Sequence, residues 1–176
     1  MNTRYTKVAL YAFKHLIKLT EQINELVEKK ALSSISDVSP AIRQYEKITE
    51  FTYQKKVILS LYVNVNSALK KLSGKELEYL DYKYFRTSKS VKSYSINPAS
   101  RNYFRVQIRL LKKVSQILER GGYTDERFKK ECLQIEFFRE MLKRVTEKEK
   151  AVTKRQIKSF SGENKIVKLY KTAISA

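Results

Sequence analysis

The sequence predicts an all-α protein, built as a bundle of amphipathic helices. Apolar residues recur at spacings of three and four along most of the chain, which is the period of a helix with one buried face. The 176 residues include only four glycines and two prolines, whereas a sandwich or barrel needs many more turn residues. Hydrophobic residues make up 42% of the chain, which is enough for a folded core.

Residues 1–72 predict a helical hairpin. One helix is predicted from residue 4 to about residue 30, and the serine-rich stretch from Ser33 to Pro40 ends it. Ser39 and Pro40 then favour the start of a second helix that runs to Leu72. We expect the hairpin to provide a dimer interface or a contact with a partner protein. The predicted buried stripe of the second helix is Ile42, Tyr45, Ile48, Phe51, Ile58, Leu61, Val65 and Leu69.

A capping motif marks the start of the next predicted helix. Ser73 and Glu76 have the spacing of a capping box, in which each side chain satisfies a backbone amide at the helix start. The helix is predicted to end near Arg86. A short polar helix is predicted within residues 87–96, and the Asn97-Pro98 pair interrupts the chain after it.

A longer helix is predicted from about Ala99 to Arg120, with Gly121 and Gly122 as its stop signal. Residues 73–123 therefore have the order of a helix-turn-helix, in which the last helix enters the major groove of DNA. This last helix has two adjacent apolar stripes, and the first is predicted to face away from the DNA: Tyr103, Val106, Leu110, Val114 and Ile117 form the first, and Phe104, Ile108, Leu111 and Leu118 form the second.

Residues 124–176 predict one further helix and a basic tail. Thr124 is a suitable N-cap, and Asp125 and Glu126 are acids in the first turn, where the helix dipole favours them. The helix is predicted to continue without a break to about Lys148. Its expected buried face is Phe128, Cys132, Ile135, Phe138, Leu142 and Val145.

Positive charge is concentrated in the middle of the chain. The formal net charge is +19, from 37 Lys and Arg against 18 Asp and Glu. Residues 83–120 contain ten basic residues and a single acid, Glu119, whereas residues 1–82 contain thirteen basic and nine acidic residues. Such an excess predicts a polyanionic partner, and nucleic acid is the first candidate.

The long basic helix carries the residue types that DNA recognition requires. Arginine pairs bidentately with guanine and asparagine with adenine, while lysine contacts phosphate. We predict that Arg101, Asn102 and Arg105 lie nearest the bases and that Arg109 and Lys112 contact phosphates. Lys89 and Lys92 of the short helix are expected to reach the DNA backbone. The predicted DNA-binding residues are thus Lys89, Lys92, Arg101, Asn102, Arg105, Arg109 and Lys112.

Three segments of this region resemble a known family. They read LSGKELEYLDYKYF at 72–85, SVKSYSI at 90–96 and SRNYFR at 100–105. They are similar to the region-four helix-turn-helix of sigma-70-type factors, and in particular to the phage-type ArpU- and RinA-like transcriptional regulators. The resemblance implies double-stranded DNA as the partner, promoter contact and association with RNA polymerase. Residues 1–72 show no match to sigma region two.

The composition argues against other classes of function. One cysteine and one histidine exclude a disulfide framework, a Cys-rich zinc site and multi-His metal centres. We expect no cofactor, no metal and no catalytic activity. Cys132 lies on an apolar stripe and is expected to be a buried, inert thiol. The absence of an apolar run of 18 residues and of a secretory signal predicts a cytoplasmic protein with no membrane partner.

We therefore predict a sequence-specific DNA-binding transcriptional regulator, and three alternatives remain. The basic helix faces belong to a plain helical bundle, or the protein is a non-specific nucleic-acid-binding packaging protein of a virus or plasmid, or it is an interaction module for an acidic protein. A bundle helix mixes Glu with Lys for solubility. The predicted helix 125–148 mixes the two signs, whereas the outward face of residues 101–118 has no acid, and this contrast favours a polyanion partner.

Overall fold

The protein is all-helical over the part of the chain that its computed structural model describes, which is residues 1–36, 41–86, 94 and 96–151. These residues contain no strand, so the predicted all-α class is confirmed. The short middle helix of the predicted helix-turn-helix falls mostly within residues 87–93, which lie outside the described residues. Tyr94 and Ile96 are described and belong to no helix. The helix-turn-helix therefore stays a prediction.

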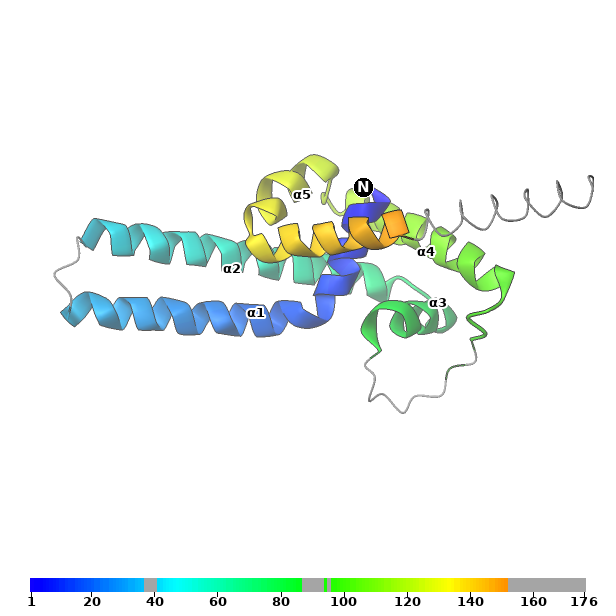
Figure 1. The fold of residues 1–176 in the computed structure, drawn as a ribbon, viewed down its shortest axis with the longest axis horizontal. Coiled ribbons are helices and arrows are strands. Elements are labelled where there is room, and N and C mark those ends of the chain that lie inside the picture. Colours follow the sequence, from blue (N-terminus) through cyan, green and yellow to red (C-terminus); the bar gives the residue numbers. More distant parts are fainter. Residues whose placement is uncertain (37–40, 87–93, 95, 152–176) are drawn as a thin grey trace, which may run out of the picture.

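Two long helices form the predicted hairpin. α1 (Thr3–Ser36) and α2 (Ala41–Lys70) lie side by side, and the other helices gather at one end of the pair (Figure 1). The break predicted from Ser33 is wrong, because α1 continues to Ser36. The outer half of the hairpin forms an arm, which we define as residues 21–36 and 41–56, and no other labelled helix covers it (Figure 1).

The arm corrects the predicted buried stripe of α2. Ile42 and Tyr45 are each 72% exposed, whereas Ile58, Leu61 and Val65 at the inner end are fully buried. The stripe keeps its helical period along its whole length, but along the arm α2 packs only against α1, and Ile42 and Tyr45 do not lie on the side that α1 covers. Periodicity indicates which face of a helix is apolar, and tertiary contacts decide whether that face is covered.

The capping box is confirmed at the start of α3 (Gly74–Leu80). The Ser73 amide donates to Glu76 Oε2 at 2.9 Å, and the Glu76 amide donates to Ser73 Oγ at 3.4 Å. The helix then widens into a π-helical segment, Asp81–Phe85, which ends where the Arg86 amide donates to the Asp81 carbonyl at 2.8 Å. Within this segment Tyr84 is buried and its ring lies 4.7 Å from that of Tyr11.

The long basic helix α4 (Arg101–Arg120) begins and ends close to its predicted limits. Ser100 is its N-cap and accepts a hydrogen bond from the Tyr103 amide at 3.1 Å. At the other end Gly121 is the C-cap, and Gly122 has a φ of +82°. This left-handed backbone conformation suits glycine because it lacks a Cβ. It turns the chain back toward the core, where Tyr123 is fully buried.

The helix predicted over residues 125–148 is broken, and this prediction was wrong. α5 (Asp125–Glu131), with Thr124 as the expected N-cap, leads into a 3₁₀ turn, Cys132–Gln134, and Ile135 is extended. A separate helix covers residues 136–151. Phe128 and Phe138 are both fully buried with ring centroids 6.2 Å apart. Ten residues of straight helix advance about 15 Å, so the chain must bend for the two rings to meet.

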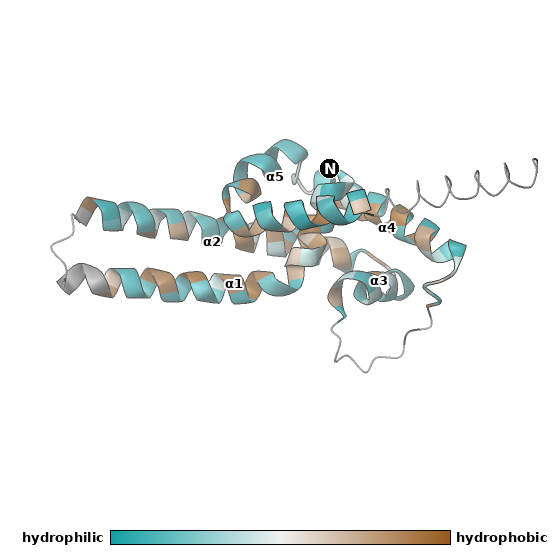
Figure 2. Ribbon diagram, viewed as in Figure 1, coloured by the Kyte–Doolittle hydropathy of each residue, from teal (hydrophilic) through white to brown (hydrophobic). Residues whose placement is uncertain are grey.

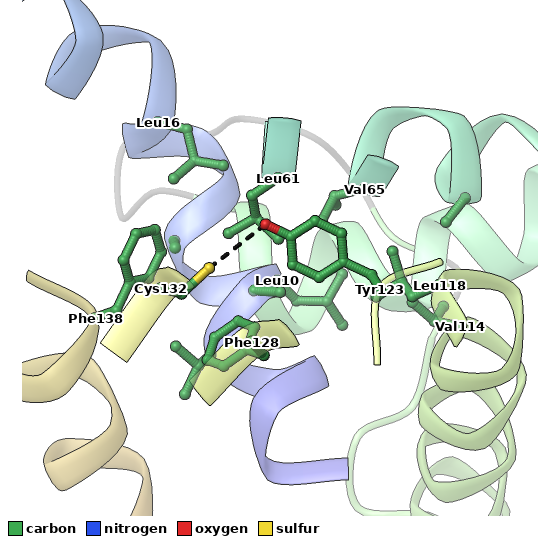
Figure 3. Close-up of a cluster of buried hydrophobic side chains, with 14 of the residues drawn as sticks. Leu10, Leu16, Leu61, Val65, Val114, Leu118, Tyr123, Phe128, Cys132 and Phe138 are labelled. Carbon is green, nitrogen blue, oxygen red and sulfur yellow. Dashed lines mark hydrogen bonds between the residues drawn. The ribbon is translucent and has the colours of Figure 1, made fainter. Parts of the chain in front are cut away.

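One hydrophobic core joins these helices (Figure 3). Brown and teal residues alternate along the ribbons, as expected for helices with one buried face (Figure 2). The Tyr123 hydroxyl lies 3.5 Å from Cys132 Sγ within this core. Cys132 is fully buried, as predicted, and burial raises the pKa of its thiol to about 12. Fully buried members of the core include Leu10, Leu16, Leu61, Val65, Val114 and Phe138.

The core packing predicts different costs for two identical substitutions in α2. Leu61 is fully buried and Leu59 is 36% exposed. We expect Leu61→Ala to lower the free energy of unfolding by about 2–5 kcal/mol, because it removes buried methyl groups and leaves a cavity. Leu59→Ala should cost less than about 1 kcal/mol. Urea unfolding followed by circular dichroism measures both, and equal losses would contradict the described core.

Candidate nucleic-acid interface

The rotation of α4 about its axis is fixed by its buried side. Tyr103, Leu110 and Val114 point into the core, where each is at most 4% exposed. Gln107 lies on the same side and donates from Nε2 to the backbone carbonyl of Tyr79 at 2.9 Å. This bond joins the middle of α4 to α3. Side chains on the opposite side of α4 must therefore face solvent.

An ion pair fixes the inner edge of α4. Lys113 Nζ lies 2.8 Å from Glu76 Oε1, so it joins the middle of α4 to the capping box of α3. The hydrogen bond from Lys113 and then the one from the Ser73 amide lower the pKa of Glu76 below its ordinary value. Lys113 is thus occupied by a structural contact, unlike its neighbour Lys112.

The five predicted DNA-binding residues of α4 share one exposed face. No carboxylate in the described part of the chain forms an ion pair with any of the four cations among them. Arg105, Arg109 and Lys112 also line a shallow recess of about 460 Å³. We call the whole set the α4 cationic face. It consists of Arg101, Asn102, Arg105, Arg109 and Lys112, all of them exposed.

The two remaining predicted contacts fall elsewhere. Lys89 and Lys92 lie outside the described residues, so their predicted role as backbone contacts stays a prediction. Next to that stretch, the Tyr94 hydroxyl donates to Asp81 Oδ2 at 2.9 Å, and its ring lies edge-on to Tyr82 with centroids 5.3 Å apart. Tyr94 therefore anchors the chain to the π-helical segment shortly before α4 begins.

Two apolar residues belong to the exposed side of α4 and were missed. Phe104 and Ile108 are each 58% exposed, although they belong to the same apolar stripe of the sequence as Leu111 and Leu118. Leu111 and Leu118 are buried. Together, the two apolar stripes cover a wider arc of the helix surface than the side of α4 that packs against the core. The usable signal was their spacing, because Phe104 lies three residues after Arg101, and Ile108 lies three residues after Arg105 and four before Lys112, which places them on the same helix face.

Other chemically reactive groups form no site in the described residues. His15 is exposed on α1, and its pKa is lowered by partial burial and by the neighbouring charges of Lys14 and Lys18. No three side chains of His, Cys, Asp or Glu are grouped so that they could hold a metal ion within the described ranges. None of the described helices combines the length and apolar character needed to span a membrane.

Comparisons with known proteins give no match. Neither the family models, nor the curated proteins, nor the solved structures include one that matches this chain.

The Lys113–Glu76 pair predicts a shifted titration. Lys113→Gln should raise the pKa of Glu76 toward its ordinary value, because the strongest contact that favours the carboxylate is removed. A glutamate with a lowered pKa stabilises the fold above its unfolded-state pKa, and this stabilisation is lost as the pH falls. The difference in the free energy of unfolding between the unchanged chain and Lys113→Gln should therefore shrink as the pH falls into the acidic range.

Side-chain carboxyl signals followed by NMR over the acidic pH range report the pKa of Glu76 directly. The matched control is Lys112→Gln, which removes an adjacent lysine that forms no ion pair in the described part of the chain. This control should leave the titration unchanged. An unaltered pKa in Lys113→Gln would show that the pair does not form.

Proposed function

We propose that this protein is a sequence-specific DNA-binding transcriptional regulator that inserts α4 into the major groove. One observation carries the proposal: the α4 cationic face is exposed, and its cations have no carboxylate partner in the described residues. A phosphate backbone attracts such a face through charge and the release of counterions. Because the opposite side of α4 is buried, the face is presented by a rigid element rather than by a loop.

The charge contrast within the chain supports this proposal over a plain basic bundle. Helix 136–151 has exposed Glu136, Arg139, Glu140 and Lys143 in close succession, which is the mixture typical of a solvated helix. In α4 the only acid is Glu119, in the last turn. Two exposed helices of the same protein therefore differ in a way that general solubility does not explain.

The residue types on the face fit direct reading of bases. Arg101 and Arg105 carry the bidentate donors that match guanine, and Asn102 carries the amide that matches adenine. Phe104 and Ile108 add exposed apolar groups next to them, which are suited to contact with the methyl group of thymine. Transcription control and a contact with RNA polymerase rest on the resemblance of residues 72–105 to sigma region four alone.

Non-specific packaging of nucleic acid is the second candidate. Basic residues outside α4 also contribute to the net charge of +19. Positive charge spread over the chain favours binding to any phosphate backbone. A specific regulator predicts one preferred duplex, whereas a packaging protein predicts equal affinity for all sequences with a steep salt dependence. An acidic-protein module predicts no DNA binding. Selection of duplexes from a random pool, followed by titrations at two salt concentrations, separates the three.

Arg105→Ala tests whether the α4 cationic face recognises bases. On the preferred duplex we expect a loss of about 1–3 kcal/mol in binding free energy, with relaxed preference at one base pair. Arg139→Ala is the matched control, since Arg139 is exposed on helix 136–151, outside the face. Fluorescence anisotropy on the preferred and on scrambled duplexes measures both variants. An equal loss on every sequence would make Arg105 a phosphate contact, and no loss would remove it from the interface.

The proposal includes pairing of two copies through the arm. Leu32, Ile42 and Tyr45 are 67%, 72% and 72% exposed there. Residues 21–56 contain six acids and six bases, in a chain with a net charge of +19. Two arms can therefore approach each other with balanced charge, whereas two α4 cationic faces repel each other. A pair would present two copies of α4 to the two half-sites of one duplex.

Removing the apolar groups of the arm should separate such a pair. We expect the double variant Ile42→Ser/Tyr45→Ser to elute as a monomer in size-exclusion chromatography with light scattering, where the unchanged chain is a dimer. Val63→Ser is the control, because Val63 is 62% exposed on α2 but lies outside the arm. An unchanged chain that is monomeric at its highest soluble concentration would contradict the pairing, as would a dimeric double variant.

A further inference from the structure

A groove lined by cations adjoins the α4 cationic face. Its volume is about 810 Å³, and it lies between α1, the π-helical segment, α4 and helix 136–151. Four cations line it, from three different elements, together with one carboxylate. These are Arg4 and Lys7 of α1, Lys83 of the π-helical segment, and Lys148 and Glu149 of helix 136–151.

The single carboxylate balances only part of this charge. Glu149 contacts Lys7 Nζ at 2.6 Å and Arg4 Nε at 2.7 Å. Burial opposes the ionisation of Glu149, but the hydrogen bonds from Lys7 and Arg4 outweigh it and lower its pKa. Lys83 and Lys148 form no ion pair with a carboxylate in the described part of the chain. The groove therefore keeps an excess of positive charge after its internal ion pairs are counted.

The lysines of the groove repel one another. The pKa of Lys83 is lowered, first by burial and then by the positive charges of Lys7, Lys148 and Arg86. The fold thus holds like charges together at a cost in electrostatic energy. An anion bound among them reduces this cost and favours the charged form of Lys83.

The groove and the α4 cationic face share a border. Phe104 and Ile108 line the groove from α4 and flank Arg105 and Arg109 along the helix. The major groove is about 12 Å wide, so a helix that enters it has a sugar-phosphate backbone on each side. A strand that passes beside α4 on the side of Phe104 meets the cation-lined groove.

We propose that this groove binds the phosphodiester backbone of one DNA strand while α4 lies in the adjacent major groove. The inference rests on the proposed function and adds a second contact zone to it. Lys83 and Lys148 bind the phosphates, and Phe104 and Ile108 contact the sugar edge or the nearest base. Arg4 and Lys7 add positive charge at the rim and remain held by Glu149.

The salt dependence of binding tests this zone. In the double variant Lys83→Gln/Lys148→Gln, the slope of log affinity against log salt concentration should fall by about 1–2, because each lost phosphate contact removes about 0.9. The affinity should fall by the same factor on preferred and scrambled duplexes. Lys18→Gln/Lys143→Gln is the matched control, since both lysines are exposed outside the groove, and its slope should equal that of the unchanged chain.

A second variant predicts a change in the opposite direction. Glu149→Gln removes the carboxylate of the groove and frees the charges of Arg4 and Lys7, so DNA should bind several-fold more tightly at low salt. Glu140→Gln is the control, because it removes an exposed carboxylate outside the groove, and it should tighten DNA binding less than Glu149→Gln does. Thermal unfolding of each variant shows that it is folded at the temperature of the titration.

The outcomes separate the two proposals. If the unchanged chain binds no duplex, the proposed function fails and this inference fails with it. If the chain binds DNA and Arg105→Ala weakens that binding, but the salt slope of Lys83→Gln/Lys148→Gln equals that of the control, only the groove inference is overturned. A loss confined to one duplex sequence would also overturn it, because a phosphate contact carries no sequence preference.

Discussion

The burial of one side of α4 is the constraint on which the rest of the arrangement depends. Tyr103, Leu110, Val114 and Leu118 are held in the core, and a helix is too stiff to turn its two sides independently. The cations on the other side are therefore fixed in direction as well as in spacing. The Lys113–Glu76 ion pair and the Gln107–Tyr79 hydrogen bond hold the same helix against α3.

Beside α4, the structure brings together charges that are far apart in the sequence. Arg4, Lys83 and Lys148 belong to different helical segments, yet they line one groove next to Phe104. The sequence shows a basic segment from residue 83 to residue 120, and α4 forms its second half. The groove extends that positive surface onto the first and last described helices. In the proposed complex, a DNA strand contacts two neighbouring surfaces: the α4 cationic face, which contacts bases and phosphates, and the groove, which contacts phosphates.

Local features were predictable from the sequence, and features that depend on distant packing were not. The capping box at Ser73, the N-cap at Thr124 and the stop at Gly121 are short-range signals, each satisfied within a few residues. The bend at Ile135 follows from the meeting of Phe128 with Phe138. The exposure of Ile42 follows from the absence of a covering helix on the arm (Figure 1). The exposed Phe104 and Ile108 show the same limit: period alone does not measure how wide a contact will be.

The most direct test of the central claim is an NMR titration of the full chain with a duplex selected from a random pool. Backbone and arginine side-chain signals report which residues meet the DNA. We predict that the largest changes follow the exposed side of α4, from Arg101 to Lys112, with little change at the outer end of the arm. Changes confined to the arm, or no change anywhere, would contradict the account.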